Sequence, residues 1–132
     1  MLAFAGVSLV MLARSERAGT KLPDAQVTVC FFRGAQRCAE CETIEAYAKE
    51  AVEKGFAEEM QAGRVAFVSI NWEARGNRQF QDRFKLGIST VVLVWKDGRF
   101  RKLDELRYFL SNKPAFVDHL QQQVAGAMKE GP

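Results

Sequence analysis

The sequence predicts an α/β fold in which a central mixed sheet of about four strands is flanked by helices. Three short runs rich in β-branched and aromatic residues, at 27–32, 65–70 and 90–95, are predicted as strands. Between them, apolar residues recur at spacings of three and four, which is typical of amphipathic helices. Strands that alternate with helices predict parallel pairing at the start of the sheet, and a hairpin then adds an antiparallel edge.

The first helix is predicted to begin near Cys38, after the first strand and a short loop. Its apolar face continues to a kink or stop near Gly55 and to a terminator at Gly63. Phe80 and Phe84, four residues apart, place one aromatic face on a second, shorter helix.

The last third of the chain is predicted to hold a hairpin and a terminal helix. Asp97 and Gly98 form the residue pair preferred in two-residue hairpin turns, so residues 99–103 return as an edge strand. Residues 104–110 are expected to form a short helix or an irregular arm. Pro114 suits the first turn of a terminal amphipathic helix.

Length and composition indicate one folded domain. The chain has 132 residues, of which 48% are hydrophobic and 27% charged, enough to bury a core. The net charge of +3 comes from 19 basic residues interspersed with 16 acidic ones, so we expect no nucleic-acid partner. We place the domain at 26–128 and a short tail at 129–132. A glycine-rich phosphate loop is absent from the sequence, so we also expect no cofactor.

The N-terminal segment, residues 1–25, is predicted to be separate from the domain. Residues 2–13 are almost entirely apolar, but about twenty such residues are needed to span a bilayer as a helix. The segment favours a remnant of a signal or anchor followed by a linker, with a short helix packed on the domain as the alternative. Membrane attachment through 2–13, or export in a bacterium, is therefore the favoured localisation, and a cytoplasmic location is the alternative.

The pair Cys38 and Cys41 is the strongest candidate for chemistry. It follows a strand and opens a helix, where free backbone N–H groups and the positive end of the helix dipole stabilise a thiolate. We expect Cys38 to be exposed and to attack a disulfide, and Cys41, one turn deeper, to resolve the mixed disulfide. The third cysteine, Cys30, lies in the first strand and is expected to be a core residue.

Several charged neighbours are expected to change the stability of the Cys38 thiolate. Arg37 and Arg33 would add positive charge near the Cys38 thiolate, and Glu40 would partly offset them. A redox-active pair is not the sole interpretation. The cysteines could instead form a structural disulfide or inert thiols, or hold a metal with ligands from a partner. A second Cys-x-x-Cys or a nearby histidine is lacking in the sequence, so we assign no metal ligands.

The order of these motifs resembles the thioredoxin superfamily, whose fold is a three-layer sandwich. The stretch 84–98 supports the resemblance, because it is similar to the family's Gly-Ile-Pro-Thr segment, apolar strand and Lys-Asp/Asn-Gly turn. More narrowly, residues 31–47 resemble a group of bacterial thioredoxin-like proteins known as nitrophenyl compound nitroreductase subunits. That group has a Phe-His-Gly and Arg-Cys-x-x-Cys pattern, with Arg33 here in place of its histidine.

Two departures from ordinary thioredoxins stand out. The family's cis-proline, which lies opposite the cysteine pair, matches Ser89, so the bond after Ile88 is expected to be trans. We expect Ser89 and Ile88 to line the substrate groove. Cys30 falls about where thioredoxins bury a carboxylate beneath the second cysteine, so Cys41 would lack an internal base.

The resemblance implies a thiol–disulfide oxidoreductase, selective for one partner, that acts on a protein or small-molecule disulfide or dithiol. Two alternatives stay open at this point. One is a non-enzymatic binding or accessory module with the same fold, and the other is dithiol handling of a metal or metalloid.

Overall fold

Four strands form one mixed sheet in the order β2-β1-β3-β4, in a computed structural model that describes residues 20–131. The strands are β1 (Val27–Arg33), β2 (Val65–Asn71), β3 (Thr90–Trp95) and β4 (Phe100–Lys102). All residues of β3, and all of β1 except the last, are buried. This burial on both faces explains why the two central strands are continuous apolar runs.

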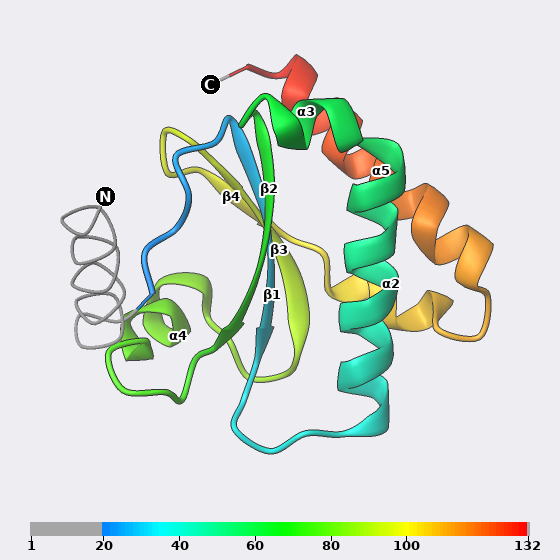
Figure 1. The fold of residues 1–132 in the computed structure, drawn as a ribbon. Coiled ribbons are helices and arrows are strands. Elements are labelled where there is room, and N and C mark those ends of the chain that lie inside the picture. The colour runs from blue at the N-terminus through cyan, green and yellow to red at the C-terminus, as the bar shows by residue number, and fades with distance from the viewer. Residues whose placement is uncertain (1–19, 132) are drawn as a thin grey trace, which may run out of the picture.

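Helices cover both faces of the sheet and complete three layers. They are α2 (Ala39–Gly55), α3 (Ala57–Gln61), α4 (Arg78–Phe84), the 3-10 helix η1 (Asp104–Phe109) and α5 (Lys113–Lys129). Figure 1 shows α2 and α5 on one side of the sheet and α4 on the other. The predicted α/β sandwich is thus confirmed, including the break in the first helical region near Gly55.

The direction of β3 differs from a simple alternating parallel sheet. β1 pairs in parallel with β2, whereas β3 runs antiparallel to β1, with Thr90 opposite Phe32. α4 has only seven residues, about 10 Å at 1.5 Å per residue. β3 starts at the end of the sheet where β2 finished.

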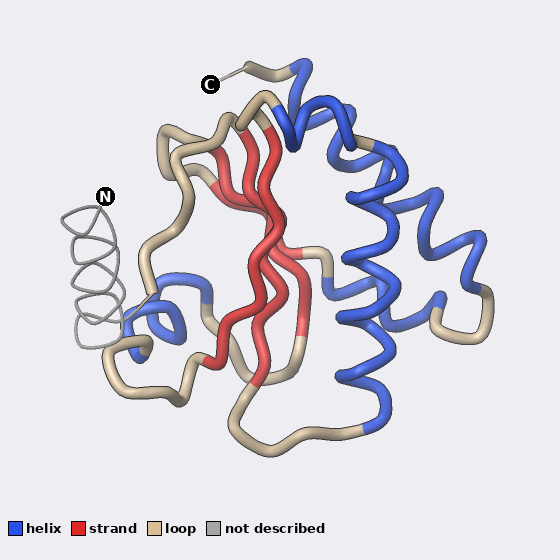
Figure 2. The backbone as a smooth tube through the Cα atoms, in the orientation of Figure 1, coloured by secondary structure: helices blue, strands red, loops and turns tan. Residues whose placement is uncertain are grey.

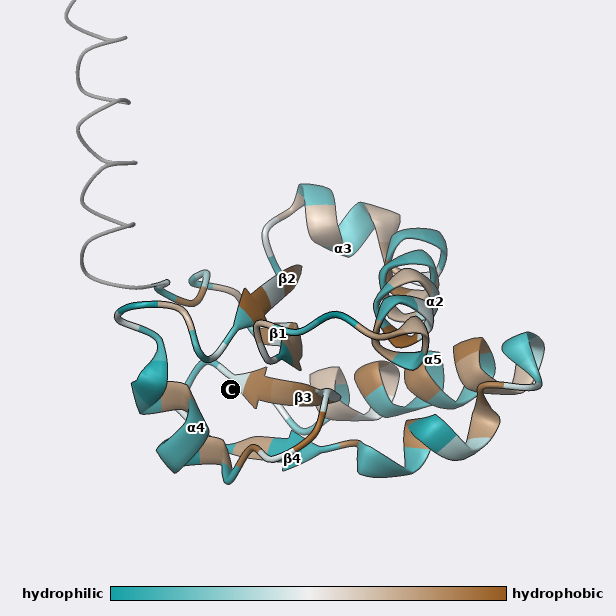
Figure 3. Ribbon diagram, turned by 90° about the horizontal axis from the view of Figure 1, so that it is seen from below, coloured by the Kyte–Doolittle hydropathy of each residue, from teal (hydrophilic) through white to brown (hydrophobic). Residues whose placement is uncertain are grey.

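Two apolar clusters lie on opposite faces of the sheet. Side chains alternate along β1, so Val29 and Phe31 pack toward α2 and α5, whereas Cys30 and Phe32 pack toward α4. Figure 3 shows hydrophobic residues along β2 and β3 and in bands on α2 and α5. The helix bands follow the three- and four-residue spacing of the sequence.

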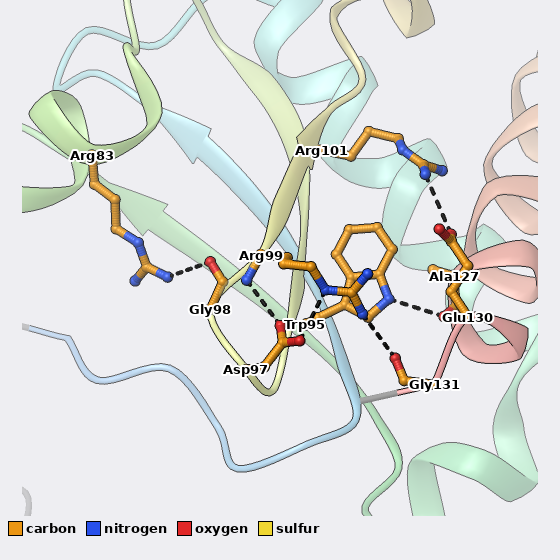
Figure 4. A network of polar contacts seen from close by, with 9 residues as sticks. All are labelled: Arg83, Trp95, Asp97, Gly98, Arg99, Arg101, Ala127, Glu130 and Gly131. Atoms are coloured by element: carbon orange, nitrogen blue, oxygen red, sulfur yellow. Dashed lines mark hydrogen bonds and ion pairs between the residues drawn. The ribbon is translucent and has the colours of Figure 1, made fainter.

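The end of the sheet at Trp95 is closed by a polar network (Figure 4). The indole Nε1 of Trp95 donates a hydrogen bond of 3.0 Å to the Ala127 carbonyl in α5. The guanidinium groups of Arg99 and Arg101 lie over the indole ring, at 5.0 and 5.3 Å from its centroid. Arg101 also pairs with Glu130 at 3.3 Å. These contacts fasten the hairpin to the end of α5.

Most of the predicted N-terminal segment lies outside the described residues, and residues 2–13 lie wholly outside them. Within residues 20–131, no helix has the length and apolar character needed to cross a membrane. The chain enters the described part at Thr20, whose backbone N–H donates to Asn77 Oδ1 at 2.7 Å.

Candidate redox site at the start of α2

The cysteine pair lies at the end of the sheet opposite Trp95. Figure 2 shows that the loop from β1 to α2 and the loop that precedes β3 both lie at this end. Cys38 is the N-cap of α2 and has extended backbone angles. Its Sγ accepts a hydrogen bond of 3.1 Å from the backbone N–H of Cys41. A sulfur in this position satisfies one of the free N–H groups of the first turn.

The two cysteines differ in exposure, as the sequence predicted. Cys38 is exposed, whereas Cys41 is 8% exposed and belongs to the core cluster between the sheet, α2 and α5. They are joined by a disulfide, with 5.1 Å between the Cα atoms. An incoming thiolate can thus approach the pair from the exposed side, at Cys38, whereas the core shields Cys41.

Ser89 lies directly against the buried sulfur. Its Oγ donates a hydrogen bond of 3.0 Å to Cys41 Sγ. The residue before it, Ile88, is 45% exposed. Residues 20–131 contain no cis peptide bond, so the bond between Ile88 and Ser89 is trans, as expected for a serine. The resemblance to thioredoxins predicted Ser89 opposite the pair, but it did not predict the hydrogen bond to Cys41.

The charged neighbours of the pair bond to other groups. Glu40, between the cysteines, lies 3.6 Å from the Arg107 guanidinium in η1. Arg37 lies 3.7 Å from Glu42, and the Arg33 guanidinium donates to the Gly34 carbonyl at 2.9 Å. Within residues 20–131, no hydrogen bond or ion pair joins Arg33 or Arg37 to a sulfur atom. A charge effect of either arginine on Cys38 would therefore act through space, where water and salt weaken it.

Glu73 fixes the loop that leads to Cys38, a role that the sequence did not reveal. Its carboxylate accepts a hydrogen bond of 2.6 Å from the backbone N–H of Ala35. The Trp72 N–H donates to the Arg33 carbonyl at 2.9 Å. A Cβ atom at Gly34 would lie 3.2 Å from Glu73 Oε2, so the close approach of the two loops favours glycine there. No local signal in the sequence links 33–35 with 72–73.

Cys30 faces away from the pair. It is fully buried among Phe32, Phe84 and Val92 on the α4 side of the sheet, whereas Cys41 lies on the α2 side. Burial raises the pKa of the Cys30 thiol to about 12, partly opposed by the charge of Arg83. The expectation that Cys30 stands where thioredoxins place an acid beneath the second cysteine is therefore wrong, because side-chain alternation along β1 puts it on the other face.

The single histidine of the sequence, His119, lies in α5. His119 Nε2 is 2.9 Å from Glu105 Oε2, and its ring packs against Phe109. This contact joins η1 to α5. Within residues 20–131, no group of three or more histidine, cysteine or acidic side chains is placed to hold a metal ion.

Comparisons with known proteins show the fold. No protein-family model matches the chain, and no curated protein sequence matches it. The solved structure of human ERp44 in its zinc-bound form superposes with a TM-score of 0.54 and 18% identity, over 76% of this chain and 27% of that one. The chain therefore spans about a quarter of the length of ERp44.

Two further structures were also found. Chloroplastic thioredoxin z gives a TM-score of 0.44 at 15% identity, over 82% of this chain and 89% of that one. Thioredoxin from Fasciola hepatica gives 0.43 at 16% identity, over 82% and 93%. The fold assignment rests on the ERp44 superposition and on the sheet topology.

The chain thus has a thioredoxin-like fold, with a Cys-x-x-Cys disulfide at the start of its first long helix. The superfamily-level prediction is confirmed at the level of the fold. The narrower resemblance to the nitrophenyl compound nitroreductase subunits stays a prediction.

Proposed function

We propose that this chain is a thiol–disulfide oxidoreductase that works through Cys38 and Cys41. The observation that carries the proposal is the asymmetry of the pair. One cysteine is exposed at a helix N-terminus, and its bonded partner is buried one turn further along. A purely structural disulfide does not require an exposed sulfur at the positive end of a helix, whereas a reactive one does.

The exchange reaction follows from this arrangement. A substrate thiolate attacks Cys38 Sγ, the bond between Cys38 and Cys41 breaks, and its electron pair leaves on Cys41 Sγ. A second substrate thiolate then attacks the substrate sulfur of the mixed disulfide and releases Cys38. The substrate dithiol has become a disulfide, and the protein has gained two electrons and two protons. In the opposite direction the reduced pair converts a substrate disulfide to a dithiol by the same steps.

In this proposal, an exposed apolar residue and several charged residues near the pair act on the substrate and on Cys38. Ile88, exposed beside the pair, provides an apolar contact for the substrate. Arg37 and Arg33 favour the Cys38 thiolate through their charge, and Glu40 opposes them less than its position suggests because Arg107 neutralises it. An exposed isoleucine beside charged side chains favours a particular protein or small-molecule partner over general disulfide reduction.

Turnover of a disulfide substrate tests the proposal. The wild-type protein, kept reduced by a dithiol, should reduce oxidised glutathione or a small aromatic disulfide catalytically. Cys38→Ser should abolish this turnover, and Cys30→Ala should retain it because Cys30 lies on the other face of the sheet. Equal turnover by wild type and Cys38→Ser would contradict the proposal and favour a non-enzymatic binding module.

A further inference from the structure

The buried sulfur of the pair has a hydrogen-bond donor of its own. Ser89 Oγ donates to Cys41 Sγ at 3.0 Å, and among the described residues no other hydrogen bond to this sulfur is found. We infer that Ser89 is the residue that stabilises Cys41 when its sulfur becomes a thiolate during disulfide exchange. This inference rests on the proposed exchange activity and adds a catalytic residue to it.

The need for such a donor follows from burial. Cys38 is exposed, so water and the backbone N–H of Cys41 can solvate its thiolate. Cys41 is 8% exposed and belongs to the same apolar cluster as Ile44 and Val91. A charge formed there loses most of its hydration, and a buried charge is costly unless hydrogen-bonded. The Ser89 hydroxyl is placed to supply that bond.

The position of Ser89 is fixed by the sheet. The next residue, Thr90, is the first residue of β3, is 3% exposed and stands opposite Phe32 in β1. Its hydroxyl donates to Asp104 Oδ1 at 2.5 Å. Pairing with β1 fixes the register of β3, and the bond to Asp104 connects the start of β3 to η1. The Ser89 hydroxyl is therefore already positioned against Cys41. A proline at this place would have neither a hydroxyl nor an N–H to donate.

The hydroxyl acts at one atom in both directions of the reaction. When a substrate thiolate attacks Cys38, the electron pair of the broken bond goes to Cys41 Sγ, and Ser89 stabilises that leaving group. When a mixed disulfide on Cys38 is resolved, the Cys41 thiol first loses its proton to water. The thiolate then attacks Cys38 Sγ, and the electron pair leaves on the substrate sulfur. Ser89 increases the fraction of Cys41 that is a thiolate before the attack.

A stopped-flow experiment separates the two sulfurs. Reduced protein is mixed with dithiobis-nitrobenzoate, which releases one coloured thiolate when Cys38 attacks and a second when Cys41 resolves the mixed disulfide. In Ser89→Ala, we expect the first phase to change less than the second, because Cys38 rather than Cys41 attacks in it. The second phase should slow about threefold to tenfold at neutral pH, since fewer Cys41 thiols are ionised. The thiolates that do form lack the hydrogen bond and are more nucleophilic, which recovers part of the loss.

The pH profile of the second phase gives a signature that a structural role would not produce. Its midpoint should move to higher pH in Ser89→Ala, and at alkaline pH the variant should equal or exceed wild type, because a thiolate without a hydrogen bond is more nucleophilic. Ser89→Thr keeps the hydroxyl and should retain the wild-type midpoint. Thermal unfolding of both variants verifies that they are folded.

Four outcomes would overturn the inference. An unchanged second phase would mean that the hydroxyl does not act on Cys41. Equal slowing of both phases would assign Ser89 to the substrate groove instead. An unchanged midpoint with a lower rate at every pH would indicate a packing defect. If the wild-type protein itself showed no second phase, the exchange activity would fail, and the inference would fall with it.

Discussion

Cys30 and Cys41 lie on opposite faces of the same sheet, both buried, and only one of them is suited to chemistry. Cys41 is bonded to an exposed partner and receives a hydroxyl hydrogen bond. Cys30 is surrounded by Phe32, Phe84 and other apolar side chains. The comparison shows that burial alone does not define the environment of a sulfur atom. Of these two described cysteines, Cys41 alone has a hydroxyl donor and a bond to an exposed cysteine.

The largest difference is expected in chemical labelling of the reduced protein. A thiol with a pKa of about 12 is ionised to about one part in ten thousand at pH 8, compared with about a quarter for a free cysteine. Cys38 should therefore react with iodoacetamide at least about a thousandfold faster than Cys30. Peptide mass spectrometry after a timed quench measures both rates.

Denaturant provides the control for this labelling. In concentrated guanidinium chloride all three cysteines should react at similar rates, because the environments that separate them are gone. Rapid modification of Cys30 in the native protein would contradict the described packing of α4 against β1 and β3.

An intermediate effect is expected in stability at alkaline pH. The pKa of Cys30 is raised in the folded state to about 12, so the unfolded chain loses this proton first as the pH rises. The unfolded state then binds fewer protons than the native state, and the free energy of unfolding falls. The loss should approach about 1.4 kcal/mol per pH unit above the unfolded-state pKa and level off near the folded one.

Cys30→Ala separates this contribution from other alkaline effects. The variant should be less stable at neutral pH because of the small cavity it leaves, but its stability should fall less steeply above about pH 9. Chemical denaturation at several pH values gives both slopes. If the free energy of unfolding fell equally steeply with pH in both proteins, Cys30 would have the same pKa in the folded and unfolded states, which would contradict the prediction.

The smallest effect is expected at the charges beside the exposed sulfur. Arg107 neutralises Glu40 at 3.6 Å, and this partly exposed pair contributes at most about 1 kcal/mol. Arg107→Ala leaves a free negative charge near Cys38, so the equilibrium with glutathione should shift toward the disulfide by less than about tenfold. Glu40→Gln should shift it in the opposite direction. Shifts of the same sign in both variants would contradict this electrostatic role.

Much of the fold was predictable because local patterns and tertiary structure agree. The apolar runs predicted β1, β2 and β3, and Asp97-Gly98 predicted the hairpin that the structure contains. The antiparallel direction of β3 was not predictable, because no local pattern shows at which end of the sheet the chain enters a strand. The placement of Cys38 and Cys41 followed from their position between a strand and a helix.

The contacts that complete the site could not be predicted from the sequence. The hydrogen bond from Ser89 to Cys41 spans 48 positions along the chain, and that from Ala35 to Glu73 spans 38. Both depend on strand register and loop packing, which no local pattern encodes. The resemblance to thioredoxins predicts Cys30 beneath Cys41, whereas the alternation of side chains along β1 places it on the other face of the sheet.

The reduction potential of the Cys38–Cys41 pair tests the central claim most directly. Equilibration with glutathione buffers, followed by mass analysis of the alkylated protein, measures it. A reversible two-electron couple between about −120 and −270 mV is expected for an exchange-active pair, and it should be absent in Cys38→Ser. A disulfide that stays intact below about −300 mV would identify a structural bond and contradict the proposed function.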